Sequence, residues 1–179
     1  MNTWIGYYLA KLKGKLFGNQ YYHLNKWFSK QGVVFTGGGT QEPIICCNIA
    51  KNEPYLISIG DDTVISGNVE LITHDHSISR LNCGIINLFG KIIIGRNCFI
   101  GNGSTILYGV TIADNVIVAA GSVVTKSINE SKVIVAGNPA RIISTWDSFY
   151  EKNKDLKLSR KQLKDMIKSS DIDKYLVKR

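Results

Sequence analysis

The chain has 179 residues, of which 44% are hydrophobic and 20% are charged, and its formal net charge is +8. This length suits one modest domain with short extensions, and this composition excludes an intrinsically disordered chain. No apolar run is long enough to span a bilayer, and the first residues lack a secretory signal, so we expect a cytoplasmic protein. No helix-turn-helix, zinc-finger or RNP-type motif accompanies the basic charge, so we expect no nucleic-acid partner.

The N-terminal segment is basic and aromatic. Residues 1–41 contain five lysines and no acidic residue. Hydrophobic side chains recur there at helical spacing, namely Ile5, Leu9, Leu12 and Leu16. We expect residues 1–42 to form a helical cap that uses this stripe to cover the open end of the domain that follows. The alternative is an interfacial element that contacts the inner face of the cell membrane.

A six-residue period organises the middle of the chain. An aliphatic residue recurs at Ile59, Ile65 and Leu71, and the same spacing returns further along. The second run consists of Ile94, Ile100, Ile106, Ile112, Val118 and Val124. In this run Gly or Ala follows the aliphatic residue in four of the six units, and the fifth position of each unit is small or branched.

Neither an α-helix nor an alternating strand produces a six-residue period. A chain folded into triangular coils does, because each hexapeptide forms one short strand and one corner, with the aliphatic side chain on the axis. Gly or Ala after the aliphatic residue suits a tight corner, and stacked coils pair their strands in parallel. The period therefore predicts an all-β solenoid, a parallel β-helix, over residues 43–143.

The two runs of repeats are out of phase. From Leu71 to Ile94 is 23 residues, which is not a multiple of six, so we predict a loop that leaves the solenoid over residues 77–91. His74 and His76 lie where this loop begins, and histidine is the side chain best suited to act as a base near neutral pH. Asp75 points away from both neighbours in an extended segment, which favours binding of an acceptor hydroxyl over orientation of a ring.

The C-terminal residues 144–179 read as a charged helical extension. Ser159 is a candidate N-cap, and hydrophobic side chains share one face of the helix that would follow, namely Leu163, Met166 and Ile167. Such a charged helix is typical of a solvated or subunit-packing element.

Residues 55–143 resemble the hexapeptide-repeat acyltransferase superfamily, in particular its galactoside, maltose and capsular-polysaccharide O-acetyltransferases. Three motifs carry the resemblance in order: IGDDTVISGNVELITHDHSI at 59–78, IGRNCFIGNGSTILYGVTIADNVIVAAGSVVTKSI at 94–128, and VIVAGNPARII at 133–143. The resemblance implies a left-handed β-helix, an exception to the usual right-handed crossover, and a homotrimer with active sites between subunits.

The resemblance also implies an activity and its site. It implies transfer of an acetyl group from acetyl-CoA to a hydroxyl of a sugar or polysaccharide, without a metal. The catalytic histidine of the family follows an Asn-Val pair, here Asn68-Val69, and that count reaches His76, with His74 as the alternative. Ser77 stands where the family commonly has proline. Phe99 stands where the galactoside branch often has tryptophan, and we expect it near the acetyl group, as part of the acceptor site.

Contacts to coenzyme A are expected from six residues that match the family: Gly101, Asn102, Ala120, Thr125, Lys126 and Arg141. Small residues allow backbone N–H groups to reach the pantetheine amides, and Lys126 and Arg141 suit phosphates.

Three other functions share parts of this pattern, and one of them, a zinc enzyme, is excluded by its histidines. An N-acetyltransferase on an amino sugar or antibiotic would use the same base. A zinc carbonic anhydrase would need three histidine ligands from separate coils, and no histidine follows His76. A non-catalytic structural β-helix would need neither a histidine at the loop nor the Val-Thr-Lys and Ala-Gly-Asn-Pro-Ala-Arg motifs.

Overall fold

The computed structural model describes residues 3–167 apart from 40, 82, 83 and 85. The chain divides into two compact units, Met1–Ile143 and Ser144–Arg179. Part of the predicted C-terminal extension, residues 168–179, lies outside the described residues. Among the helices that are described, none combines the length and the apolar character needed to cross a membrane.

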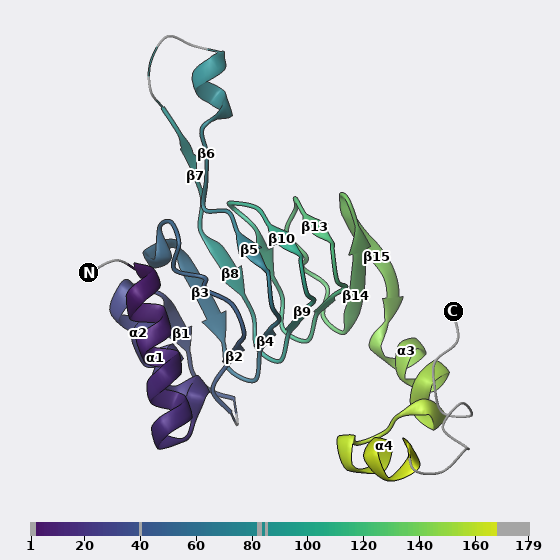
Figure 1. The fold of residues 1–179 in the computed structure, drawn as a ribbon. Coiled ribbons are helices and arrows are strands. Elements are labelled where there is room, and N and C mark those ends of the chain that lie inside the picture. Colours follow the sequence, from purple (N-terminus) through teal and green to yellow (C-terminus); the bar gives the residue numbers. More distant parts are fainter. Residues whose placement is uncertain (1–2, 40, 82–83, 85, 168–179) are drawn as a thin grey trace. The chain divides into compact units, whose positions relative to one another are not determined.

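The repeats of the first unit form three sheets, which are the faces of a stack of coils (Figure 1). Face A contains β1 (Val34–Thr36), β3 (Ile57–Gly60), β8 (Ile92–Ile94) and β11 (Thr111–Ile112). Face B contains β2 (Ile44–Ile45), β4 (Val64–Ile65), β9 (Phe99–Ile100), β12 (Ile117–Val118), β14 (Val133–Gly137) and β15 (Ala140–Thr145). Face C contains β5 (Glu70–Leu71), β10 (Thr105–Ile106) and β13 (Val123–Val124).

The strand register confirms the six-residue period as a coil of three hexapeptides. Parallel partners on the three faces are Ile94 with Ile112, Ile100 with Val118, and Ile106 with Val124. Each partner lies 18 residues further along the chain, which is three units of six. One turn of the coil therefore places one hexapeptide on each face.

The core is the column of aliphatic side chains that the period predicted. Every aliphatic residue of the two repeat runs is buried. The fifth positions are buried as well, and several are polar. Thr63 shows why: its hydroxyl donates to the Gly95 carbonyl oxygen at 2.8 Å and accepts from the Cys98 N–H at 3.0 Å. Small hydroxyl side chains thus satisfy backbone groups that the corners leave buried.

The coil that joins face C to face A carries the insertion. Glu70 pairs with Thr105, 35 residues away instead of 18. The additional residues include an antiparallel hairpin of β6 (His74–Asp75) and β7 (Leu88–Phe89), with a 3₁₀ turn at Ser77–Arg80. The Gly90 N–H donates to the Thr73 carbonyl oxygen at 3.1 Å and closes the hairpin. The insertion predicted over 77–91 is therefore a hairpin that begins at His74 and leaves the stack (Figure 1).

Two helices, α1 (Thr3–Phe17) and α2 (Gln20–Gln31), precede the coils. The α2 helix buries Leu24 and Phe28 in the core and contacts β2 and the 3₁₀ turn Pro54–Leu56. The hydrophobic stripe that was predicted to cover the coils belongs to α1, and its four side chains, Ile5, Leu9, Leu12 and Leu16, are exposed. The expectation that this stripe faces the solenoid is wrong, because α2 occupies that position and α1 packs against α2.

The second unit contains α3 (Trp146–Asn153), a 3₁₀ turn at Lys154–Leu156 and α4 (Arg160–Ile167). The Thr145 hydroxyl caps α3 by accepting from the Ser148 N–H at 3.3 Å. The Ser159 hydroxyl accepts from the Gln162 N–H at 3.2 Å, which confirms Ser159 as a capping residue.

Candidate active site

One edge of the coil stack gathers the side chains with acid–base character. At this A–C edge the chain passes from face C to face A, first through the hairpin, then through residues 107–110, and then through residues 125–127. The Tyr108 hydroxyl donates to Asp75 Oδ2 at 3.2 Å. This bond ties the base of the hairpin to the next coil.

His76 lies at the end of β6 and is exposed. The hairpin register pairs His74 with Phe89 and Asp75 with Leu88, so the next opposing pair is His76 and Asn87. Accordingly, His76 Nδ1 lies 2.8 Å from Asn87 Oδ1. In the tautomer that donates from Nδ1, Nε2 is unprotonated and can accept a proton. The Ser79 Oγ lies 3.1 Å from this Nε2 and donates to the His76 carbonyl oxygen at 2.8 Å.

His74 has a different partner, from the preceding coil. Its Nδ1 lies 3.0 Å from Glu53 Oε2, and the Thr73 hydroxyl donates to the same oxygen. Burial alone would raise the pKa of Glu53, but the hydrogen bonds from Thr73 and His74 and the charge of His74 outweigh it and lower this pKa. The side chain of His74 is 34% exposed and that of Glu53 is 21% exposed, so this pair is partly shielded from solvent.

Asp75 is held within the chain. Its Oδ1 accepts the Ser77 N–H at 2.7 Å, and its Oδ2 accepts the Tyr108 hydroxyl. The bonds from Ser77 are the main cause of its lowered pKa. Both oxygens therefore already accept a hydrogen bond within the chain. The contact of Asp75 with an acceptor hydroxyl remains a prediction.

Three residues expected to contact coenzyme A lie on a second edge, between faces B and C. Gly101 and Asn102 follow β9, and Ala120 follows β12 one coil further on. The corners stack so closely that a Cβ atom on Gly101 would lie 2.4 Å from the Ala120 backbone nitrogen. Asn102 and Ala120 are exposed at this B–C edge.

The other three cluster near the last coil. Thr125 and Lys126 lie on the A–C edge, and Lys126 and Arg141 line one cavity of about 510 Å³. Two cationic side chains against one carboxylate, that of Glu130, leave this cavity with a positive balance of charge, which suits an anionic ligand such as a phosphate. The structure therefore brings Lys126 and Arg141 together, as a shared role requires.

Phe99 lies on neither of these edges. It is 43% exposed on β9, in the middle of face B, and face B is opposite the A–C edge of a three-sided stack. One chain therefore does not bring Phe99, Gly101 or Ala120 together with the histidines.

Three partners of the site were not predicted from the sequence, namely Glu53, Asn87 and Tyr108. Asn87 depends on the hairpin register, and Tyr108 depends on how the coils stack. Glu53 precedes the first clear repeat, at the N-cap of the 3₁₀ turn Pro54–Leu56, which the six-residue period does not reach. The β2–β4 pairing has an offset of 20 residues, the same as from Glu53 to Thr73, and the six-residue period does not predict this offset.

Comparison with known proteins agrees with this architecture. Residues 91–126 match the hexapeptide repeat of succinyl-transferase. The chain is 47% identical over 103 residues to protein CapG of Staphylococcus aureus, covering 56% of this chain and 59% of CapG. It is 38% identical over 99 residues to the galactoside O-acetyltransferase of Escherichia coli K12, covering 54% of this chain and 47% of that protein. The chain thus spans about half the length of these curated relatives.

A solved structure, the maltose O-acetyltransferase of Clostridium difficile 630, superposes with a TM-score of 0.53 at 27% identity, over 80% of this chain and 87% of that one. The repeat, the relatives and the coil architecture agree, and the chain is similar in sequence and in fold to hexapeptide-repeat acetyltransferases.

Proposed function

We propose that this protein is an acetyl-CoA-dependent O-acetyltransferase that acetylates a hydroxyl of a sugar or polysaccharide. The observation that carries the proposal is His76, with Nδ1 on Asn87 and Nε2 at the base of the hairpin, on the same edge as Lys126. The similarity to a galactoside and a maltose O-acetyltransferase supports a sugar hydroxyl as the acceptor.

In the proposed mechanism the acceptor attacks directly. His76 Nε2 takes the proton of the acceptor hydroxyl, and the resulting oxygen attacks the thioester carbonyl of acetyl-CoA. A backbone N–H stabilises the tetrahedral oxyanion. When this intermediate collapses, the C–S bond breaks and the imidazolium returns its proton to the departing thiolate. Acetyl ester and free coenzyme A are the products, and no covalent enzyme intermediate forms.

His76 is preferred over His74 for two reasons. It matches the position of the catalytic histidine in the family motif, and its side chain is exposed and pairs with the neutral Asn87 rather than with a carboxylate. The Ser79 hydroxyl near Nε2 is one that an acceptor hydroxyl would replace. His74 pairs with the Glu53 carboxylate and is a structural and electrostatic neighbour of the base in this proposal.

The proposal includes a left-handed β-helix and a homotrimer. Phe99, Gly101 and Ala120 lie away from the histidines within one chain, and a neighbouring subunit is the simplest source of the missing side of the site. Lys126 and Arg141 would bind the phosphates of coenzyme A in the cavity that they share.

The test is thiol release from acetyl-CoA with a panel of sugars and capsule fragments. We expect acceptor-dependent release by the wild type and a loss of about 10²–10⁴-fold in kcat for His76→Ala. Loss in His74→Ala alone would keep the reaction and move the base to His74.

Coenzyme A binding, measured by calorimetry, is the control for folding. We expect His76→Ala to bind coenzyme A like the wild type, because the proposed binding residues lie elsewhere. If no acceptor supports release and the wild type does not bind coenzyme A, the enzyme proposal is wrong and a structural β-helix remains.

A further inference from the structure

The α1 helix packs on α2 through its small residues. A Cβ atom on Gly6 would lie 2.5 Å from Trp27 Nε1, and one on Gly14 would lie 2.4 Å from the Gln20 Cα. Ala10, between these two glycines at the same spacing, is buried. The side of α1 that meets α2 therefore contains Gly6, Ala10 and Gly14 at intervals of four residues, beside the buried Tyr7, whose ring contacts Trp27 and Phe28.

The opposite side of α1 is apolar and exposed. The α1 apolar face consists of Ile5, Tyr8, Leu9, Leu12 and Leu16, whose exposed fractions range from 47% for Leu9 to 69% for Leu16. At 100° per residue these side chains lie within an arc of about 100°. A continuous apolar arc of this kind on a surface helix is typical of a binding surface rather than of scattered exposure.

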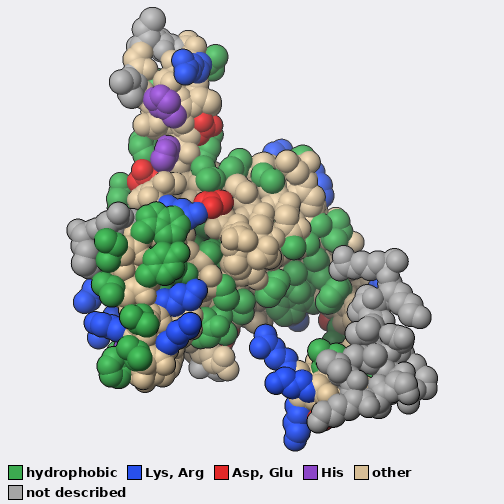
Figure 2. Space-filling view, in the orientation of Figure 1, with side chains coloured by type: hydrophobic (Ala, Val, Ile, Leu, Met, Phe, Trp, Pro, Cys, Tyr) green, Lys and Arg blue, Asp and Glu red, His purple; other side chains and the backbone are tan. Residues whose placement is uncertain are grey.

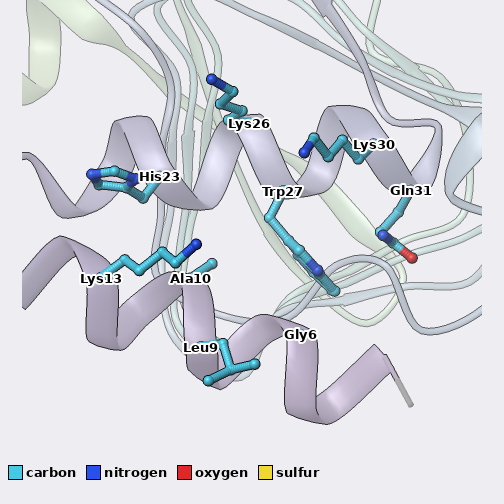
Figure 3. Close-up of a pocket in the computed structure, with 9 residues that line it drawn as sticks. All are labelled: Gly6, Leu9, Ala10, Lys13, His23, Lys26, Trp27, Lys30 and Gln31. Carbon is cyan, nitrogen blue, oxygen red and sulfur yellow. The ribbon is translucent and has the colours of Figure 1, made fainter. Parts of the chain in front are cut away.

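Lysines flank this face. Lys11 and Lys15 lie toward one border of the arc and Lys13 toward the other. Lys13 also lines a cavity of about 520 Å³ between the two helices, together with Lys26, Trp27 and Lys30 (Figure 3). Figure 2 shows hydrophobic and basic side chains side by side over this part of the molecule. No acidic residue in positions 1–41 neutralises these five lysines.

An apolar arc bordered by lysines matches the surface of an anionic bilayer, where leucines enter the acyl boundary and ammonium groups meet lipid phosphates. A second copy of this chain is a poorer occupant, because it would bring two sets of unneutralised lysines together. We propose that the α1 apolar face and the lysines around it dock the protein on an anionic phospholipid membrane. This inference does not depend on the proposed acetyl transfer.

The experiment is flotation of the full-length protein with phosphatidylglycerol vesicles and with phosphatidylcholine vesicles. We expect binding to the first, weak binding to the second, and weaker binding as salt rises. Replacing Lys11, Lys13 and Lys15 by Gln should reduce the affinity for phosphatidylglycerol about 100-fold, since each lysine contributes roughly a factor of five. Leu12→Glu combined with Leu16→Glu should reduce it by at least about tenfold.

The matched control replaces three lysines of the second unit, Lys152, Lys157 and Lys161, by Gln. It removes the same charge and should bind vesicles as the wild type does. Absence of binding to phosphatidylglycerol, or equal binding to both vesicles, would overturn the proposal. So would a fall in molar mass of the Leu12→Glu and Leu16→Glu variant by light scattering, because the face would then be a subunit interface.

Discussion

Three consecutive residues at the base of the hairpin take their partners from three different parts of the chain. His74 bonds to Glu53 of the preceding coil, Asp75 to Tyr108 of the following coil, and His76 to Asn87 across the hairpin. An extended segment makes this possible because successive side chains point in opposite directions. The two histidines therefore differ in their electrostatic surroundings although they are separated by one residue.

The Glu53 carboxylate, which pairs with His74, should make the stability of the fold depend on pH. Its folded-state pKa lies below the ordinary value of 4.5, so its carboxylate stabilises the fold above that pH, and this contribution is lost as the pH falls through the folded-state pKa. Glu53→Gln should lower the free energy of unfolding by about 1 kcal/mol at pH 7. The difference from wild type should shrink below pH 4.5 in urea unfolding measured from pH 3 to pH 7.

Glu70→Gln is the control, because Glu70 carries the same charge in an exposed pair with Lys51. We expect a smaller change in stability from this substitution. A difference between Glu53→Gln and wild type that stays constant down to pH 3 would show that the carboxylate charge is not what matters at position 53.

Most hexapeptides have the same structural role at each of their positions. The aliphatic residue fills the axis, the next residue is most often small because the neighbouring coil approaches closely, and in seven of the nine units the fourth residue turns the chain with a positive φ angle. The turning position is occupied by Asp, Asn or Gly, namely Asp62, Asn68, Asn97, Gly103, Gly109, Asn115 and Gly121. These residue types adopt the left-handed region at the lowest cost.

Two glycines of the same corner should therefore respond differently to substitution. Gly101→Ala places a Cβ atom 2.4 Å from the Ala120 backbone nitrogen and should cost about 1–3 kcal/mol in the free energy of unfolding. Gly103 has a φ of +70° and open space around it, so Gly103→Asn should stay within about 0.5 kcal/mol of wild type. Urea midpoints of the two variants test this, and equal losses would contradict the close stacking at Gly101.

At the scale of the whole molecule, the proposed site is divided between edges. The histidines lie on the A–C edge, whereas Gly101, Asn102 and Ala120 lie on the B–C edge and Phe99 lies on face B. In the proposed homotrimer, a closed ring, one edge of each subunit would face a different edge of the next subunit. The A–C edge of one copy and the B–C edge of its neighbour would then form one complete site.

Co-expression of two inactive chains tests this arrangement. His76→Ala removes the proposed base, and Ala120→Glu blocks the proposed coenzyme A surface of the exposed B–C edge. If each site takes His76 from one subunit and Ala120 from the next, randomly mixed trimers should recover about a quarter of the wild-type activity. Thiol release by the purified hybrids is the measurement.

A mixture of Asn102→Glu and Ala120→Glu chains is the matched control, because both changes lie on the same edge and every hybrid site remains blocked. No recovery in the first mixture would mean that His76 and Ala120 serve a site within one subunit.

The sequence by itself determined the repeat, the buried aliphatic column, the existence of an insertion and the position of the two histidines. These follow from local spacing, because every hexapeptide repeats the same strand and corner. Only the tertiary structure decided which side chains meet. Glu53 and Asn87 reach the histidines, and Tyr108 reaches Asp75, through coil stacking and hairpin register, which depend on pairings 11 to 33 residues apart. The helical spacing of apolar residues also did not predict the orientation of α1. Its glycines allow a close approach to α2, and the side chains of the predicted stripe are exposed on the other side.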